Sequence, residues 1–62
     1  MDKYGIIYKI FDGREEYSFA ETAAERDSAI KEAKEDSDII SIDFFRIYKD
    51  GDISGYKRVF NR

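Results

Sequence analysis

Two Asp-Gly dipeptides, Asp12-Gly13 and Asp50-Gly51, constrain the fold of this chain more than any other feature. Each lies between runs of β-branched and aromatic residues, where Asp-Gly is typical of a β-hairpin turn because Gly reaches positive φ without steric cost. The segment between them, residues 22–36, consists mostly of good helix formers. The sequence therefore predicts an α+β fold with the order ββαββ: a four-stranded, mainly antiparallel sheet made of two hairpins, with one helix packed on one face.

The length of the chain fits one small domain, residues 1–62, with a modest core. A domain of this size buries only about 60% of the surface that its unfolded chain exposes. The chain contains no Cys and no His, so disulfides and the usual zinc ligand sets are excluded, and we expect no cofactor and no metal site. The core must come from packing alone, and we expect the five Tyr and five Phe to supply most of it.

The first hairpin is expected to join strands at residues 4–11 and 14–20. A two-residue turn would place Tyr8 opposite Tyr17 and Ile6 opposite Phe19, which gathers the large apolar side chains on one face. A three-residue loop with a bulge would shift this pairing by one residue and separate the set. We expect the two-residue register.

The helix is expected to begin with a capping box. Thr22 would accept a hydrogen bond from a free backbone N–H, and Glu25 would reach back to the amide of Thr22. Ile30 is the one large apolar residue on the side that also carries Ala23, Ala29 and Ala33. Small residues on that side should let the helix approach the sheet closely.

The second hairpin, from strands at 39–49 and 52–60, is apolar on both faces. Strict alternation puts Ile40, Ile42, Phe44 and Tyr48 on one face and Ile39, Phe45 and Ile47 on the other. If the second turn has two residues, Tyr56 and Phe60 would lie on the same face as this second set. If the turn is bulged, Ile53 and Val59 would lie there instead. Ile7 and Phe11 of the first hairpin could extend the same apolar face. Gly55 indicates a bulge or bend. Because one helix covers one face, the second apolar set should remain exposed. Exposed aromatics are common on small sheets, but a contiguous apolar patch often marks an interface.

The residue inventory argues against catalysis. Without His or Cys, the commonest general base and the strongest nucleophile are missing. We therefore expect that this protein is not an enzyme. Asp36, Asp38 and Asp43 have a spacing that superficially suggests a cation loop, but the glycine of an EF-hand is absent. No segment resembles a targeting signal or a membrane span, and the expected location is the cytoplasm, with no membrane or small-molecule partner.

We therefore expect a non-enzymatic protein-binding module, with self-association through the outer face of the second hairpin as one form of it. The expected contact residues are Phe45, Ile47, Tyr56 and Phe60, with Lys57 and Arg58 at the rim. The alternative is nucleic-acid binding by the same hairpin. Residues 45–62 carry five basic and two acidic side chains, whereas residues 1–44 carry six basic and twelve acidic ones. The overall charge of −3 argues against nucleic acid, as does the simpler explanation that Asp43 pairs with Arg58 or Lys57 across the strands.

Two weaker ideas remain. The carboxylates on and around the helix invite comparison with a DNA mimic, but Arg26, Lys31 and Lys34 are interspersed among them. The order hairpin, helix, hairpin resembles that of the immunoglobulin-binding domains of streptococcal protein G. The resemblance is in element order, and no binding residue can be matched, so it implies nothing about function.

Overall fold

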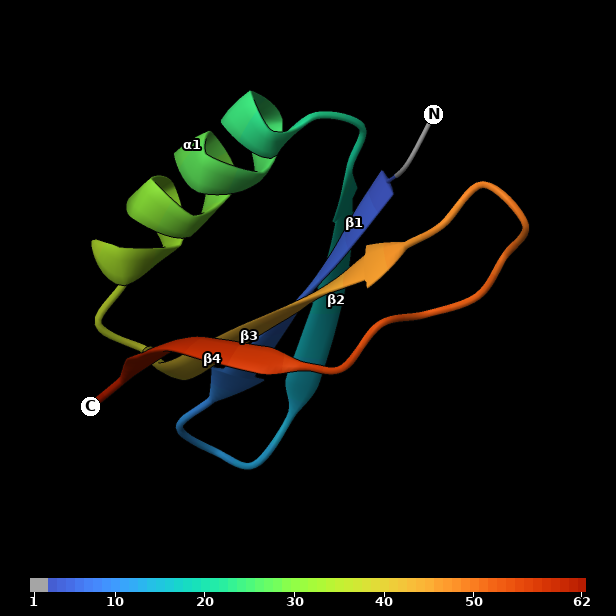
Figure 1. The fold of residues 1–62 in the computed structure, drawn as a ribbon. Coiled ribbons are helices and arrows are strands. Elements are labelled where there is room, and N and C mark those ends of the chain that lie inside the picture. Colours follow the sequence, from blue (N-terminus) through green and yellow to red (C-terminus); the bar gives the residue numbers. More distant parts are fainter. Residues whose placement is uncertain (1–2) are drawn as a thin grey trace.

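The computed structural model describes residues 3–62 and confirms the ββαββ architecture. The elements are β1 (Lys3–Ile10), β2 (Glu15–Ala20), α1 (Ala23–Lys34), β3 (Ile39–Ile47) and β4 (Lys57–Asn61). The four strands form one sheet in the order β2-β1-β3-β4, and all neighbouring strands are antiparallel. The helix lies across one face of this sheet (Figure 1). The central pair is therefore β1 and β3, and β2 and β4 are the edges.

Both Asp-Gly turns are three-residue loops. In the first, the amide of Ile10 donates to the carbonyl of Arg14 (2.8 Å) and the amide of Gly13 donates to that of Ile10 (3.0 Å). The side chain of Asp12 accepts from the Arg14 amide at 3.1 Å, and Gly13 has φ 95°. The second loop repeats this pattern. The amide of Tyr48 donates to the carbonyl of Asp52 at 2.8 Å, the amide of Gly51 donates to the carbonyl of Tyr48 at 2.9 Å, and the amide of Asp52 donates to the side chain of Asp50 at 3.1 Å. Each glycine thus takes the left-handed position that closes a bulged loop.

The two-residue register expected for the first hairpin is therefore wrong. Tyr8 lies opposite Glu16, and Ile6 lies opposite Ser18. The shift by one residue turns Tyr17 and Phe19 away from the helix, because side chains alternate along a strand. Their exposed fractions are 63% and 69%.

The core between sheet and helix is aliphatic at its centre. It comprises Ile6, Ile10, Ala20, Ile30, Ile39 and Ile42, of which Ile6 and Ile42 are fully buried. Partly buried aromatics surround this centre: Tyr4, Tyr8, Phe44 and Phe60. The ring-dominated core expected from composition is thus replaced by an isoleucine centre with an aromatic margin.

Two β-bulges change which residues face the helix. Between β1 and β3, Lys9 pairs with Ser41 but Ile10 pairs with Ile39, so Ile40 is an extra residue and Ile39 turns into the core. Between β3 and β4, a second shift makes Val59 the extra residue, and it packs against the core together with Phe60. The expected placement of Ile39 and Phe60 on the outer face is wrong for this reason, since a bulge interrupts the two-residue alternation.

Side chains satisfy backbone groups at both ends of α1. At the start, the Glu25 amide donates to the Thr22 hydroxyl at 3.1 Å, as expected, but the Glu25 carboxylate accepts from the amide of Glu21 (3.0 Å). After the helix, the guanidinium of Arg62 donates to carbonyls of Lys34 (3.1 Å), Asp36 (3.0 Å) and Ile39 (2.7 Å). The last residue of the chain thereby ties β4 to the connection between α1 and β3, where no glycine caps the helix.

Candidate interaction surface

The outer face of the sheet is the face away from α1, and it is rich in apolar side chains. Within the part of the chain that the structure describes, no helix covers it. Three of its aromatic rings are largely exposed: Tyr17 (63%), Phe19 (69%) and Tyr56 (63%). Its other apolar residues are Ile7, Phe45, Ile47 and Ile53.

Phe45 is the buried anchor of this face. Its partner on β1 is Gly5, and a Cβ atom placed on Gly5 would lie 2.2 Å from Cζ of Phe45, so the ring rests directly on the glycine backbone. Tyr56 packs edge-on against the same ring, with 5.0 Å between ring centroids and 63° between planes. These two contacts leave Phe45 only 8% exposed. Phe45 therefore positions Tyr56 more than it presents a contact surface of its own.

The second hairpin extends the outer face beyond the regular sheet. Ile47 and Ile53 form an isolated bridge, and the Ser54 amide donates to the carbonyl of Arg46 at 2.9 Å. The next pairing is Phe44 with Lys57, so the register shifts between these points. This confirms the irregularity expected near Gly55, and it leaves Tyr56 free to fold over Phe45.

Most charges on the outer face have an opposite charge beside them, and Lys3, which lies opposite Ile47, is a further cation on this face. The guanidinium of Arg58 makes a two-point contact with the Asp43 carboxylate, at 2.8 and 3.3 Å, which confirms one of the expected cross-strand pairs. The hydrogen bond and charge of Asp43 raise the pKa of Arg58. On the other edge, Glu15 lies opposite Lys9 and accepts a hydrogen bond from the Tyr17 hydroxyl at 3.3 Å; the charge of Glu15 is the largest cause of the raised pKa of Tyr17.

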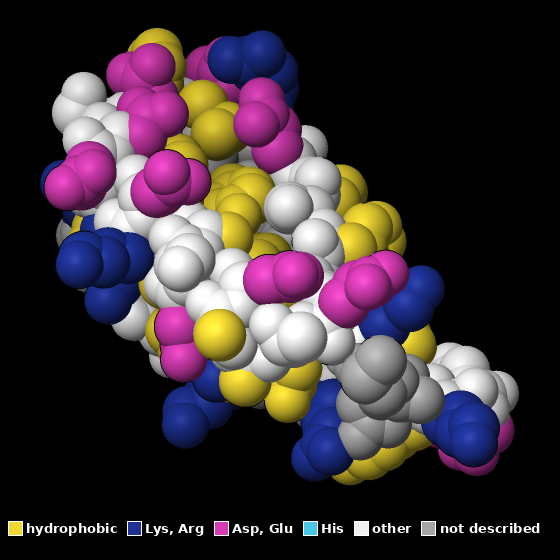
Figure 2. All heavy atoms as spheres, turned by 90° about the horizontal axis from the view of Figure 1, so that it is seen from above, with side chains coloured by type: hydrophobic (Ala, Val, Ile, Leu, Met, Phe, Trp, Pro, Cys, Tyr) yellow, Lys and Arg dark blue, Asp and Glu magenta, His cyan; other side chains and the backbone are white. Residues whose placement is uncertain are grey.

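The opposite side of the molecule carries many more carboxylates. Figure 2 shows the molecule from above the view of Figure 1, that is, from the side on which α1 lies. Asp and Glu side chains are scattered over much of that surface. Acidic residues on or beside the helix include Glu21, Glu25, Glu32, Glu35 and Asp36, all of them exposed. The negative charge of the chain is thus concentrated away from the outer face.

The structure divides the six predicted contact residues between the two faces. Phe45, Ile47, Tyr56 and Arg58 lie on the outer face. Phe60 lies opposite Ile42 and packs on the core, with the guanidinium of Arg62 4.9 Å from its ring centroid. Lys57 lies opposite Phe44 and lines a hollow beside α1.

Sequence reasoning missed Tyr17 and Phe19 as exposed members of this face. The available signal was the three-residue alternative for the Asp12-Gly13 turn, which separates these rings from the core-facing residues of β1.

Two features are absent from residues 3–62. No group of three or more acidic side chains is arranged to hold a metal ion, and no helix in this range is long and apolar enough to cross a membrane. Comparisons with protein-family models, curated proteins and solved structures gave no significant match. The geometry of the faces is therefore the basis for a functional hypothesis.

Proposed function

We propose that this protein is a small non-enzymatic protein-binding module, and that the partner of its outer face is a second copy of the chain. The observation that carries the proposal is the exposure of Tyr17, Phe19 and Tyr56, each more than 60%, on one uncovered sheet face. Exposed aromatic clusters of this kind are enriched at protein interfaces, where a ring buries a large area with little loss of side-chain freedom.

Charge distribution favours the outer face for contact between two copies of the chain. The chain has a net charge of −3, so two copies repel each other over most of their surfaces. On the outer face, however, Asp43 is paired with Arg58, and Glu15 lies opposite Lys9. This near-neutral apolar face is where two copies can approach with least repulsion. Two sheets pack readily face to face, and a two-fold axis would place the same aromatic rings from each copy in contact.

Binding of single-stranded nucleic acid is the second candidate, because exposed rings on a sheet can stack on bases. The charges of the second hairpin argue against this candidate. Lys57 faces the other side of the sheet, and the charge of Arg58 is neutralised by Asp43. Phosphate contacts by unpaired cations supply much of the affinity for nucleic acid, and this face offers few of them.

Sedimentation equilibrium from micromolar to millimolar concentration tests the proposal. We expect the apparent mass to rise from the 7.3 kDa of one chain toward twice that value. Phe19→Ser should weaken association about tenfold or more, as for a central aromatic contact. Phe11→Ser is the matched control: Phe11 is 66% exposed but lies in the first loop, outside the strands, and its substitution should leave association unchanged.

A mass that stays at one chain up to millimolar concentration, in wild type and Phe19→Ser alike, would refute self-association. Titration with single-stranded oligonucleotides at two salt concentrations separates the second candidate. Binding that weakens steeply with salt and is lost in Phe19→Ser would favour nucleic acid. Equal effects of Phe11→Ser and Phe19→Ser on mass would show that the outer face is not the contact surface.

A further inference from the structure

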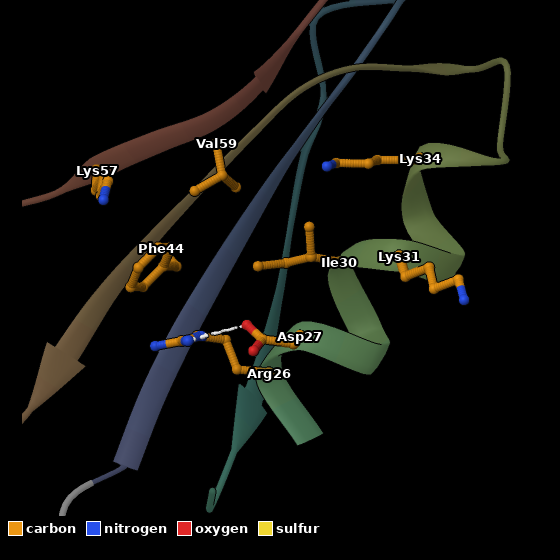
Figure 3. Close-up of a pocket in the computed structure, with 8 residues that line it drawn as sticks. All are labelled: Arg26, Asp27, Ile30, Lys31, Lys34, Phe44, Lys57 and Val59. Atoms are coloured by element: carbon orange, nitrogen blue, oxygen red, sulfur yellow. Dashed lines mark hydrogen bonds and ion pairs between the residues drawn. The ribbon is translucent and has the colours of Figure 1, made fainter. Parts of the chain in front are cut away.

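A hollow lies on the helix side of the molecule, between α1 and the strands β3 and β4. It has a volume of about 410 Å³, within the range of small-molecule sites. Its apolar lining is formed by Ile30 from the helix, Phe44 from β3 and Val59 from β4 (Figure 3). The bulge at Val59 matters here, because it turns this residue toward the helix side, where it packs at the margin of the core.

Arg26 closes one end of the hollow and neutralises its one carboxylate. The guanidinium lies 4.6 Å from the ring centroids of both Tyr4 and Phe44, and it contacts the Asp27 carboxylate at 2.9 Å. The side chain of Arg26 is only 19% exposed. This residue is thus a fixed wall, and Asp27 is already balanced by it.

Three further cations line the hollow without an acidic counterpart among its lining residues: Lys31, Lys34 and Lys57. Lys34 and Lys57 come from opposite walls, the helix and the edge strand. Figure 3 shows Lys34 extending from α1 toward the strands, whereas the ammonium group of Lys31 is turned away from the hollow. The methylene stems of Lys34 and Lys57 add apolar surface while their charged ends remain at the rim.

We propose that this hollow binds a small amphiphilic anion: an apolar body seated on Ile30, Phe44 and Val59, with a single carboxylate or phosphate at the rim, attracted by Lys34 and Lys57 from its two walls. The charge argues for this class of ligand, because Lys34 and Lys57 have no acidic counterpart among the lining residues and the one lining carboxylate, Asp27, is paired with Arg26. An apolar floor beneath a cationic rim selects against polar anions through the floor and against neutral or cationic amphiphiles through the rim. The site is separate from the outer face and does not depend on self-association.

Methyl NMR titration of the whole chain with octanoate tests the proposal, with octan-1-ol and octylammonium as probes of the same tail. Octanoate should produce saturable shifts at the methyl groups of Ile30 and Val59. It should bind about tenfold more tightly than octylammonium, since the head group is held by charge-assisted contacts. Lys34→Gln and Lys57→Gln should each weaken octanoate binding several-fold. Lys49→Gln, a lysine in the second loop and outside the lining, is the matched control and should leave it unchanged.

Three results would overturn the proposal. Octylammonium binding as tightly as octanoate would show that the rim charges select nothing. Shifts that appear at Ile7 and Ile47 instead would place the probe on the outer face. Absence of saturable shifts at Ile30 and Val59 would show that the hollow does not hold an eight-carbon anion.

Discussion

Substitution of Gly5 by Ala tests the contact that organises the outer face. A Cβ atom on residue 5 would lie 2.2 Å from Cζ and 2.6 Å from both Cε atoms of Phe45, all far inside van der Waals contact. Because Phe45 is 8% exposed and is held by Tyr56 at 5.0 Å, its ring has little room to retreat without breaking that contact. Gly5→Ala should therefore destabilise the fold, although Ala ordinarily suits a strand better than Gly.

The expected size follows from overpacking. Inserting a methyl group into a filled site costs about 1–3 kcal/mol, and in a domain of this length 2 kcal/mol corresponds to a fall in Tm of about 15 °C. Phe45→Val removes the ring atoms that Gly5 supports. In that background Gly5→Ala should change stability by roughly +0.5 kcal/mol in the stabilising direction, because the clash is gone and the unfolded chain is less flexible. The sign of the Gly5→Ala effect thus depends on residue 45.

Thermal and urea unfolding of the wild type, both single variants and the double variant complete a double-mutant cycle. The predicted coupling free energy is about 2.5 kcal/mol, from a loss of about 2 with the Phe45 ring present and a gain of about 0.5 without it. Gly5→Ala that is neutral in the wild type, or equally destabilising with and without the Phe45 ring, would refute the stacking of Phe45 on Gly5.

Three further predictions concern the helix ends and the core margin. Thr22→Ala should lower the free energy of unfolding by about 1 kcal/mol in urea titration, through loss of the cap, whereas Ser28→Ala, an exposed position inside α1, should not. Arg62→Ala should speed hydrogen exchange at the Ile39 amide several-fold, since three carbonyls around the end of α1 lose their donor, and Arg62→Lys should restore little of the protection because one ammonium cannot reach all three. Burial is the largest cause of the raised pKa of Tyr8. The neutral phenol therefore contributes to the stability of the fold at pH values below its ordinary pKa of 10.0, and this contribution is lost as the pH rises through the higher pKa of the folded state. Tyr8→Phe should reduce this alkaline loss of stability, measured by urea unfolding at a series of pH values.

The sequence predicted what depends on local chemistry. The two turns, the helix and the Thr22 cap follow from residues that act within a few positions of one another. The number of residues in each turn could not be predicted in this way, because Asp-Gly is compatible with both two- and three-residue loops. A two-residue type I′ turn requires positive φ at both central residues, and in the structure only the glycines, Gly13 and Gly51, have positive φ among the described residues.

Features that depend on distant segments were the least predictable. The bulges at Ile40 and Val59 arise from pairing between strands, and they moved Ile39 and Phe60 from the expected outer face into contact with the core. Arg62 reaches carbonyls more than twenty residues away in sequence. Phe45 and Ile47, the predicted contact residues on β3, were assigned to the correct face because the alternation of side chains is regular from Ser41 to Ile47.

The most direct test of the proposed association is an isotope-filtered NOE experiment on a mixture of labelled and unlabelled chains at millimolar concentration. Self-association through the outer face predicts intermolecular NOEs among the rings of Tyr17, Phe19 and Tyr56, and none from the exposed side of α1. Intermolecular NOEs that arise from α1, or a sample that is dimeric by mass but shows none at these three rings, would contradict it.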